Sequence, residues 1–277
     1  MKTVTLPSGE RVPALGIGTW RMGESRAARA EEIATLRLAV DLGASLIDTA
    51  EMYGDGATET LVGEAVSDRR DAVFLVSKVY PHNASRKGTA AACERSLRRL
   101  RTDRIDLYLL HWRGEVPLAE TLEAFLDLQR EGKIRYFGVS NLDLGDLREL
   151  DALPGARGVA TDQVLYNLMR RGVEWDLLPW LRERRIPLMA YSPLEQGRLA
   201  RHRGLAAFAA RHDFTPAQAA LAWLLSRDGV IVIPKSGNRG RLRENLAALD
   251  HPLTTAQLGE LDGIFPAPAG PAPLAML

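Results

Sequence analysis

The amino-acid sequence predicts an α/β fold, a (β/α)8 TIM barrel with an N-terminal β-hairpin closing the bottom. Eight short apolar runs are spread along the 277 residues, and they begin at residues 15, 45, 73, 105, 134, 159, 186 and 230. Amphipathic segments with the period of a helix separate them. The runs are continuously apolar, as is typical of parallel strands that helices cover. Eight such units in a chain of this length favour a closed barrel.

The two ends of the chain lie outside the eight units. The stretch "TVTLPSGERVPAL" alternates apolar and polar residues around a Pro-Ser-Gly-Glu turn, so residues 1–14 are predicted to form a hairpin that plugs the N-terminal mouth. Residues 265–277, "FPAPAGPAPLAML", are rich in proline and alanine and are predicted to be a loop or a mobile tail. No linker interrupts the rest, so residues 1–277 are predicted to be a single domain.

Three of the segments between the runs show the helical pattern most clearly. In residues 30–43, Ile33, Leu36 and Val40 share one face, and the segment ends at a glycine. Residues 118–133 show the same pattern, again with a glycine as the stop. In residues 215–229, Thr215 is a good N-cap and Pro216 suits the first turn.

Composition excludes several classes of function. Lys plus Arg number 36 and Asp plus Glu 35, so the net charge of +1 provides no general attraction to nucleic acid or membrane. The single cysteine, Cys93, cannot form a disulfide within the chain and is predicted to pack in the core. No histidines show metal-ligand spacing, and no apolar run reaches the ~18 residues of a membrane span. A cytoplasmic monomer without metal is expected.

Polar side chains end seven of the eight apolar runs. They are Asp48, Lys78, His111, Asn141, Gln163, Ser192 and Lys235. Any one of them is also compatible with a solvated strand end. In a parallel barrel, however, the carboxyl ends of all strands meet at one mouth, which is where barrels carry out chemistry. The sequence therefore predicts a functional site at that mouth.

Four residues near these ends suit proton transfer. The phenol of Tyr53 titrates near ~10, and a nearby Lys78 ammonium would lower that pKa. Asp48 could keep Lys78 charged and aimed, while His111, neutral or protonated, could donate a second hydrogen bond. This set suits a carbonyl oxygen that becomes an alkoxide as hydride reaches the carbon. The alternative is that Lys78 and Asp48 form a structural ion pair at the barrel rim.

A hydride donor needs a binding site of its own. The stretch "GIGTWRMG" fails the Rossmann pattern because Arg21 stands at its third glycine, and no Walker motif is present. The stretch "IPKSGNRGRLRENL" after the eighth run places a helix start beside several cations, which favours an anion. Lys235 and Arg241 are predicted to bind a phosphate there, whereas Arg239 and Arg243 are expected to face solvent.

Eight blocks of this chain resemble the aldo-keto reductase superfamily: "GIGTW", "LIDTAEMYG", "VFLVSK", "IDLYLLHW", "GKIRYFGVSN", "QVLYN", "AYSPL" and "IPKS…RENL". They follow the family's order and cover nearly the whole chain. The stretches "LIDTAEMYG" and "SKVYP" and the short loops most resemble the bacterial members that reduce methylglyoxal and other small aldehydes. The resemblance implies NADPH (or NADP+) as cofactor and a small carbonyl compound as substrate.

The resemblance also implies roles for single residues. Asp48, Tyr53, Lys78 and His111 match the catalytic tetrad, with Tyr53 as general acid. The cofactor positions are matched by Ser140, Asn141 and Gln163 at the nicotinamide carboxamide, Tyr191 on the nicotinamide ring, Ser192 and Leu194 at the pyrophosphate, Lys235, Ser236 and Arg241 at the 2′-phosphate, and Glu244 and Asn245 at the adenine. Trp20 and Trp112 match the aromatic walls of the substrate pocket.

The loops and the function carry further expectations. The loop after "SPL" and the tail are shorter than is common in the family, which predicts quick cofactor exchange and a shallow, poorly discriminating mouth. The leading hypothesis is NADPH-dependent reduction of aldehydes and ketones, especially small 2-oxo-aldehydes such as methylglyoxal, to alcohols. The alternatives are a sugar-acid ketone reductase of the diketogluconate type and a low-turnover regulatory subunit that binds the cofactor.

Overall fold

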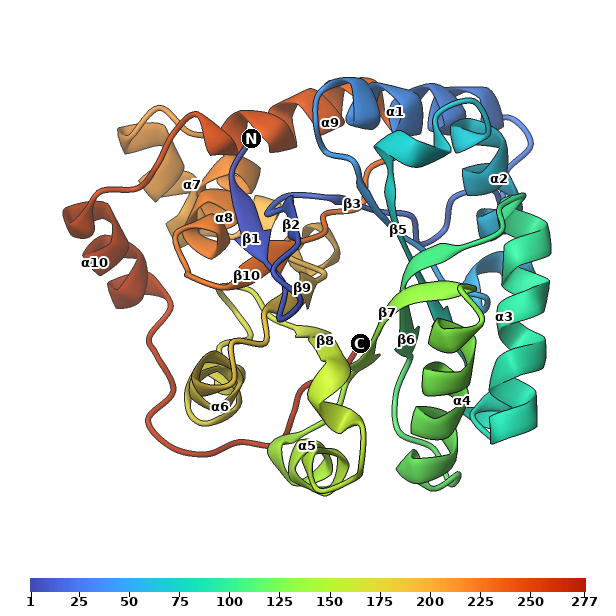
Figure 1. Ribbon diagram of the computed structural model, residues 1–277. Helices are drawn as coiled ribbons and strands as arrows, with labels where there is room; N and C mark the ends of the chain where they lie inside the picture. The colour runs from blue at the N-terminus through green and yellow to red at the C-terminus, as the bar shows by residue number, and fades with distance from the viewer.

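Eight parallel strands form the predicted barrel in the computed structural model, which describes residues 1–277 (Figure 1). The strands pair in chain order, and bridges from Leu15 to Val232 and from Gly18 to Lys235 close the ring between the first and the last. All eight predicted runs are therefore confirmed as strands. They are β3 (Ile17–Gly18), β4 (Leu46–Asp48), β5 (Phe74–Val79), β6 (Ile105–Leu110), β7 (Ile134–Ser140), β8 (Val159–Leu165), β9 (Leu188–Tyr191) and β10 (Val230–Val232).

Helices surround the barrel because each crossover between parallel strands must return across the outside of the sheet. Every residue of β5, β6 and β8 is buried, since one face of each strand packs in the barrel and the other packs against helices. The α-helices are α1 (Arg29–Asp41), α2 (Ala57–Val66), α3 (Arg86–Leu100), α4 (Leu118–Arg130), α5 (Leu144–Asp151), α6 (Leu177–Glu183), α7 (Arg203–Arg211), α8 (Pro216–Leu225), α9 (Arg239–Leu246) and α10 (Thr255–Ile264).

The predicted helix signals act as expected. The Thr215 hydroxyl accepts a hydrogen bond from the Gln218 amide at 3.2 Å, and the Gln218 side chain accepts one from the Thr215 amide at 2.9 Å, which completes a capping box on α8. Gly43 follows α1 with φ of +88°, a conformation that glycine adopts without strain. None of the helices combines the length and apolar character needed to cross a bilayer.

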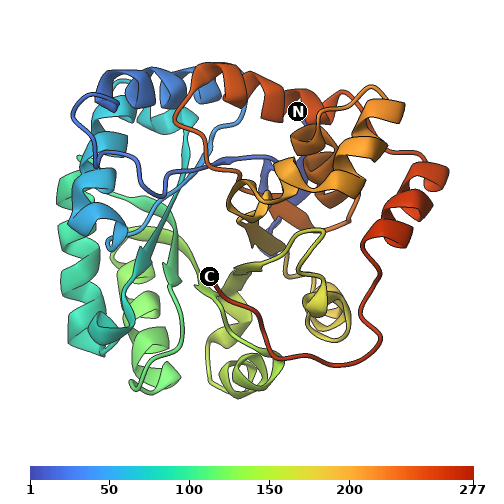
Figure 2. The ribbon, with the colours of Figure 1, turned by 180° about the vertical axis from the view of Figure 1, so that it is seen from behind.

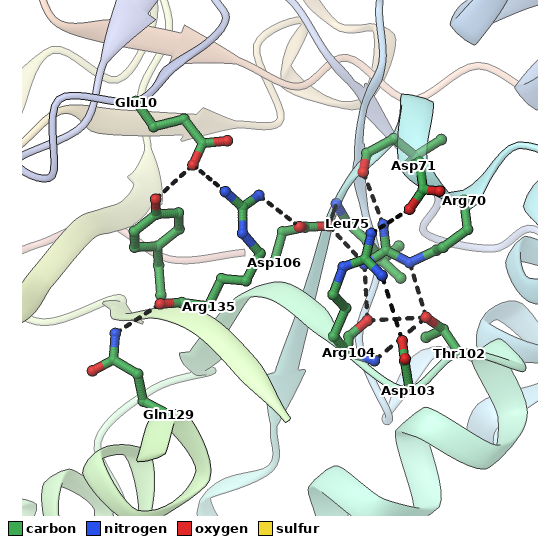
Figure 3. Close-up of polar contacts among 12 residues, drawn as sticks. Glu10, Arg70, Asp71, Leu75, Thr102, Asp103, Arg104, Asp106, Gln129 and Arg135 are labelled. Carbon is green, nitrogen blue, oxygen red and sulfur yellow. Dashed lines mark hydrogen bonds and ion pairs between the residues drawn. The ribbon is translucent and has the colours of Figure 1, made fainter. Parts of the chain in front are cut away.

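The hairpin lies across the N-terminal end of the barrel, as predicted. Its strands are β1 (Thr3–Thr5) and β2 (Arg11–Pro13), and a polar network joins its turn to the barrel (Figure 3). Glu10 accepts hydrogen bonds from Arg135 and from the Tyr136 hydroxyl, each at 2.5 Å. Arg135 also donates to Asp106 at 2.9 Å, and Asp106 accepts from Arg70 at 2.7 Å. This network fixes the hairpin to β6 and β7.

The chain's last segment crosses to the centre of the barrel at the end opposite the hairpin. Figure 2 shows it passing around the outside of α6 and then turning inward between α6 and α5. Residues 266–277 form no helix or strand. Leu274 packs against the apolar core, and the Leu277 backbone amide lies against the Tyr191 hydroxyl. The tail therefore forms part of the barrel mouth, which the sequence analysis expected to be shallow.

Candidate active site

Four elements bring Asp48, Tyr53, Lys78 and His111 together at the C-terminal mouth. Asp48 is the last residue of β4, Lys78 lies near the end of β5, and His111 directly follows β6. Tyr53 begins a short 3-10 turn, η1 (Tyr53–Gly56), in the loop after β4. Because the strands are parallel neighbours, their carboxyl ends lie side by side.

Lys78 is the centre of this group. Its ammonium nitrogen lies 2.8 Å from each carboxylate oxygen of Asp48 and 2.8 Å from the Thr49 carbonyl oxygen. The Tyr53 hydroxyl lies 3.4 Å from the same nitrogen. The Lys78 side chain is 0% exposed and that of Asp48 is 3% exposed, so each charge depends on the other for compensation.

The pKa of Tyr53 differs from the sequence-based expectation. Burial raises this pKa well above 10, and the negative charge of Asp48 raises it further. The expectation that Lys78 would lower it was wrong because Lys78 makes three shorter contacts to Asp48 and Thr49, and Asp48 balances its charge. Burial also lowers the pKa of Lys78, against the opposing effect of Asp48. Tyr53 is therefore a protonated phenol at neutral pH.

His111 is a neutral imidazole in this setting. Burial lowers its pKa well below 6.5, and the Lys78 charge adds to the effect. Its ring lies edge-on to the Tyr53 ring, with centroids 5.8 Å apart, and to the Trp112 ring, with centroids 4.9 Å apart. The buried Nδ1 atom has no hydrogen-bond partner, and no protein group bonds to Nε2. The question that the sequence left open, neutral or protonated, is thus answered.

The residues predicted at the nicotinamide share a chain of hydrogen bonds beside the tetrad. Gln163 donates to Asp48 at 2.7 Å, and the Ser140 hydroxyl donates to the Gln163 carbonyl at 2.7 Å. Asn141 donates to the Ser140 hydroxyl at 3.1 Å and accepts from the Tyr191 hydroxyl at 3.0 Å. Burial raises the pKa of Tyr191 to about 12, so its hydroxyl stays protonated.

The residues predicted at the two phosphate positions lie after β9 and β10: Ser192, Leu194, Lys235 and Ser236 are in loops, and Arg241 is in the first turn of α9. Ser192 has φ of +46°, and the backbone amide of Leu194 has no hydrogen-bond partner within the protein. Lys235 and Arg241 are exposed and form no ion pair, whereas Ser236 is buried and its hydroxyl bonds to the backbone of Asn238. Free amides and unpaired cations are groups that bind phosphate.

The remaining predicted residues lie on and around α9 or at the mouth of the barrel. Arg239, expected to face solvent, is exposed but forms an ion pair with Glu31 at 2.9 Å. Glu244 and Asn245 lie on α9, and Asn245 is buried. Trp112 follows His111 directly, and Trp20 follows β3 with 37% of its surface exposed. Both tryptophans therefore lie at the mouth.

The structure also contains buried polar residues that the sequence analysis did not select. Glu195, 0% exposed, accepts hydrogen bonds from Asn167 at 2.7 Å and from Arg170 at 3.0 Å. Asp162, next to Gln163, is 0% exposed, and neither of its carboxyl oxygens has a hydrogen-bond partner. A carboxylate repels phosphate, so the sequence gives no reason to select Glu195 in a loop that is expected to bind phosphate.

Known proteins are similar to this chain along its whole length. Methylglyoxal reductase YeaE of Escherichia coli K12 is 48% identical over 281 residues, which span 100% of this chain and 99% of that protein. A crystal structure of an aldo/keto reductase from Klebsiella pneumoniae in complex with NADP and acetate has a TM-score of 0.97 at 47% identity, covering 100% of this chain and 99% of that one.

A third protein is more distant but still similar throughout. A putative 2,5-diketo-D-gluconic acid reductase B has a TM-score of 0.86 at 34% identity and covers 100% of this chain and 97% of that one. The sequence profile of the Aldo/keto reductase family matches residues 14–265, which include the whole barrel. On this evidence the chain belongs to the aldo/keto reductase family.

Proposed function

We propose that this protein reduces small 2-oxo-aldehydes such as methylglyoxal to alcohols with NADPH, and that Tyr53 is the proton donor. The observation that carries the proposal is the contact of the Tyr53 hydroxyl with Lys78 at 3.4 Å, beside the neutral His111. A protonated phenol and an imidazole at one barrel mouth can both donate hydrogen bonds to one carbonyl oxygen. The name of the 48% identical relative supports methylglyoxal as the substrate.

The residues around this mouth fit a dinucleotide with a 2′-phosphate. The free Leu194 amide, in a loop with a left-handed backbone at Ser192, suits a pyrophosphate. Lys235 and Arg241, exposed and unpaired beside the start of α9, suit a further phosphate. The Gln163 side-chain oxygen accepts no hydrogen bond within the protein and is available to a carboxamide. When bound, the reduced nicotinamide supplies the hydride.

The protein's own part in the reaction is to position and protonate the substrate oxygen. Negative charge grows on that oxygen as the carbonyl is reduced, and Tyr53 then gives up its proton. The phenolate that results lies beside the Lys78 ammonium, whose attraction to this oxygen increases as the charge appears. An interaction that strengthens only as charge develops raises kcat rather than substrate affinity.

His111 provides the second hydrogen bond. Its Nδ1 atom is buried without a partner, and a buried N–H without an acceptor is costly. The proton of the neutral ring therefore resides on Nε2, the nitrogen that remains open to the mouth. From there the N–H can donate to the substrate oxygen and hold it near Tyr53.

Steady-state oxidation of NADPH with a panel of carbonyl compounds tests the proposal. We expect rapid turnover of methylglyoxal and other small 2-oxo-aldehydes, and slower turnover with NADH in place of NADPH. Cofactor binding without turnover of any aldehyde would identify a regulatory subunit instead. The intact set of Asp48, Tyr53, Lys78 and His111 favours turnover.

One observation favours a sugar-acid ketone reductase as second candidate. The Arg21 guanidinium stacks on the Trp20 ring at 4.4 Å and forms no ion pair, so it is free to bind a substrate carboxylate at the mouth. A higher kcat/KM for a keto sugar acid than for methylglyoxal in the same panel would establish this alternative.

We also propose that the protein works as a cytoplasmic monomer built from one barrel domain. The buried apolar side chains of hairpin, barrel and helices form one continuous cluster, and only seven large apolar side chains are exposed. Light scattering after gel filtration measures the mass, and a value twice the 30.4 kDa of the chain would refute the monomer.

A further inference from the structure

The loop that follows β9 has an unusual backbone. Ser192, Glu195 and Gln196 all have positive φ, between +46° and +52°, and Gly197 follows at +86°. Residues other than glycine rarely adopt this left-handed backbone conformation, because their Cβ atom crowds the backbone. Such conformations persist only where the surrounding structure holds them, and they gather at ligand-binding sites. Residues 192–198 are called the phosphate loop below.

The unusual backbone of this loop leaves two N–H groups without hydrogen-bond acceptors in the protein. Leu194 has φ of −106° and ψ of +14°, and Glu195 has φ of +48°, so a right-handed residue is followed by left-handed ones. Such an alternation is the backbone pattern of concave anion sites, in which neighbouring N–H groups converge. The Glu195 amide itself donates to the Ser192 carbonyl at 2.9 Å. The amides of Leu194 and Gln196 have no acceptor within the protein.

The side chain of Glu195 connects this loop to the one before it. Its carboxylate is 0% exposed, and it accepts hydrogen bonds from Asn167 at 2.7 Å, from Arg170 at 3.0 Å and from Arg198. Asn167, itself 0% exposed, also donates to the Ser192 carbonyl at 3.0 Å. Asn167 and Arg170 follow β8, so the carboxylate joins loops from two neighbouring strands.

We propose that Glu195 is a positioning residue that holds the phosphate loop in its anion-binding conformation before the cofactor arrives. The proposal rests on the proposed function, since the anion is the pyrophosphate of NADPH. Its buried carboxylate fixes the side chain of a left-handed residue, while Asn167 fixes Ser192 at the start of the loop. A loop ordered in advance loses little conformational entropy on binding, so affinity increases without any contact from Glu195 to the ligand.

The sign of the effect separates this role from simple electrostatics. A negative charge near an anion site weakens anion binding, so removing the charge should tighten binding if Glu195 acted only through its charge. Removal would also free two guanidinium groups, from Arg170 and Arg198, to attract phosphate. A positioning role gives the opposite result, because the loop loses its fixed conformation.

The test measures NADP+ and NAD+ binding by isothermal titration calorimetry with the full chain. For Glu195→Gln, which keeps the size of the side chain and removes its charge, we expect Kd to rise at least about tenfold for both nucleotides, by the same factor. The factor is shared because both nucleotides contain the pyrophosphate. Turnover at saturating NADPH should stay within about twofold of the wild type, because Tyr53 and Lys78 are untouched.

Two further variants exclude a loss of folding as the cause. Asp106→Asn removes another buried, arginine-paired carboxylate, at the opposite end of the barrel, and should lower stability without changing either Kd. Arg170→Met removes a half-buried partner and leaves Glu195 bonded to Asn167, so it should raise both Kd values by a smaller, equal factor.

Several results would overturn the proposal. Tighter binding by Glu195→Gln would show that the carboxylate acts through its charge, and an unchanged Kd would leave it a purely structural role. A loss confined to NADP+ would assign it to the 2′-phosphate. If the wild type bound neither nucleotide, the proposed function itself would fail, and the first titration shows this separately.

Discussion

Replacement of Tyr53 by phenylalanine should abolish most catalysis while leaving the fold and cofactor binding intact. The hydroxyl has a single protein contact, Lys78 at 3.4 Å, which is long for a hydrogen bond. Its loss should therefore change the free energy of unfolding by less than about 1 kcal/mol. The ring can keep its edge-on contact with His111, so the mouth should retain its shape.

The catalytic loss should be much larger than the loss of stability. A positioned acid contributes at least ~100-fold to the rate, which corresponds to ~2.7 kcal/mol of transition-state stabilisation. The assay measures kcat with saturating NADPH and methylglyoxal, together with NADP+ affinity and thermal unfolding. We expect kcat to fall at least ~100-fold while the Kd for NADP+ stays within about twofold.

Tyr136→Phe provides a matched control. Its hydroxyl donates to Glu10 at 2.5 Å at the other end of the barrel, so this variant should lose some stability and keep full turnover. If Tyr53→Phe retained turnover comparable to the wild type, the proton would come from another group. If instead it lost cofactor binding, Tyr53 would be a binding residue, and the mechanism would be wrong.

Four other properties follow from the structure. Because the pKa of Tyr53 lies well above 10 and that of His111 well below 6.5, kcat should be flat between pH 6.5 and 9 in a buffered pH series, and a titration near pH 7 that disappears in His111→Gln would contradict this. Arg241→Ala should raise KM for NADPH about 10- to 100-fold, the value of a charged contact, with little change for NADH; equal changes would show that Arg241 does not read the 2′-phosphate. Burial raises the pKa of Asp162 well above 3.8, so the folded state holds a proton that the unfolded state releases, and the contribution of Asp162 to stability falls as pH rises above about 4. Asp162→Asn should therefore be more stabilising at pH 8 than at pH 5 in urea unfolding, and an equal effect at both would indicate that Asp162 is ionised in the folded protein. Cys93 is 0% exposed with its pKa raised to about 12 by burial, so it should react with a thiol reagent only after unfolding.

The barrel could be predicted from the sequence because its strands have a strong and simple signal. Runs such as residues 105–110 are buried on both faces, so most of their positions are apolar, and the pattern ends abruptly at the mouth. The polar residues that end seven of the eight runs are then expected at the same mouth. This rule alone was enough to group Asp48, Lys78 and His111, but it did not predict the distances between them.

The properties that depend on side-chain packing could not be predicted in this way. The pKa of Tyr53 depends on how Lys78 divides its hydrogen bonds, and the Thr49 carbonyl that takes one of them has no signature in the sequence. Glu195 lies close in sequence to residues expected to bind phosphate, where the negative charge of a carboxylate is unfavourable. Its partner Asn167 comes from another loop, so only the folded chain reveals the pair.

The distribution of charge explains how one barrel mouth can both bind a nucleotide and handle a proton. Lys78 and Asp48 compensate one another where both side chains are buried, because an unpaired charge there would be too costly. Lys235 and Arg241 are left unpaired, and both are exposed, where water solvates them until a phosphate replaces it. In the proposed function, these two free cations recognise the phosphate. In the proposed mechanism, the buried Lys78 ammonium attracts the Tyr53 oxygen strongly only after Tyr53 has lost its proton. That phenolate exists only late in the reaction.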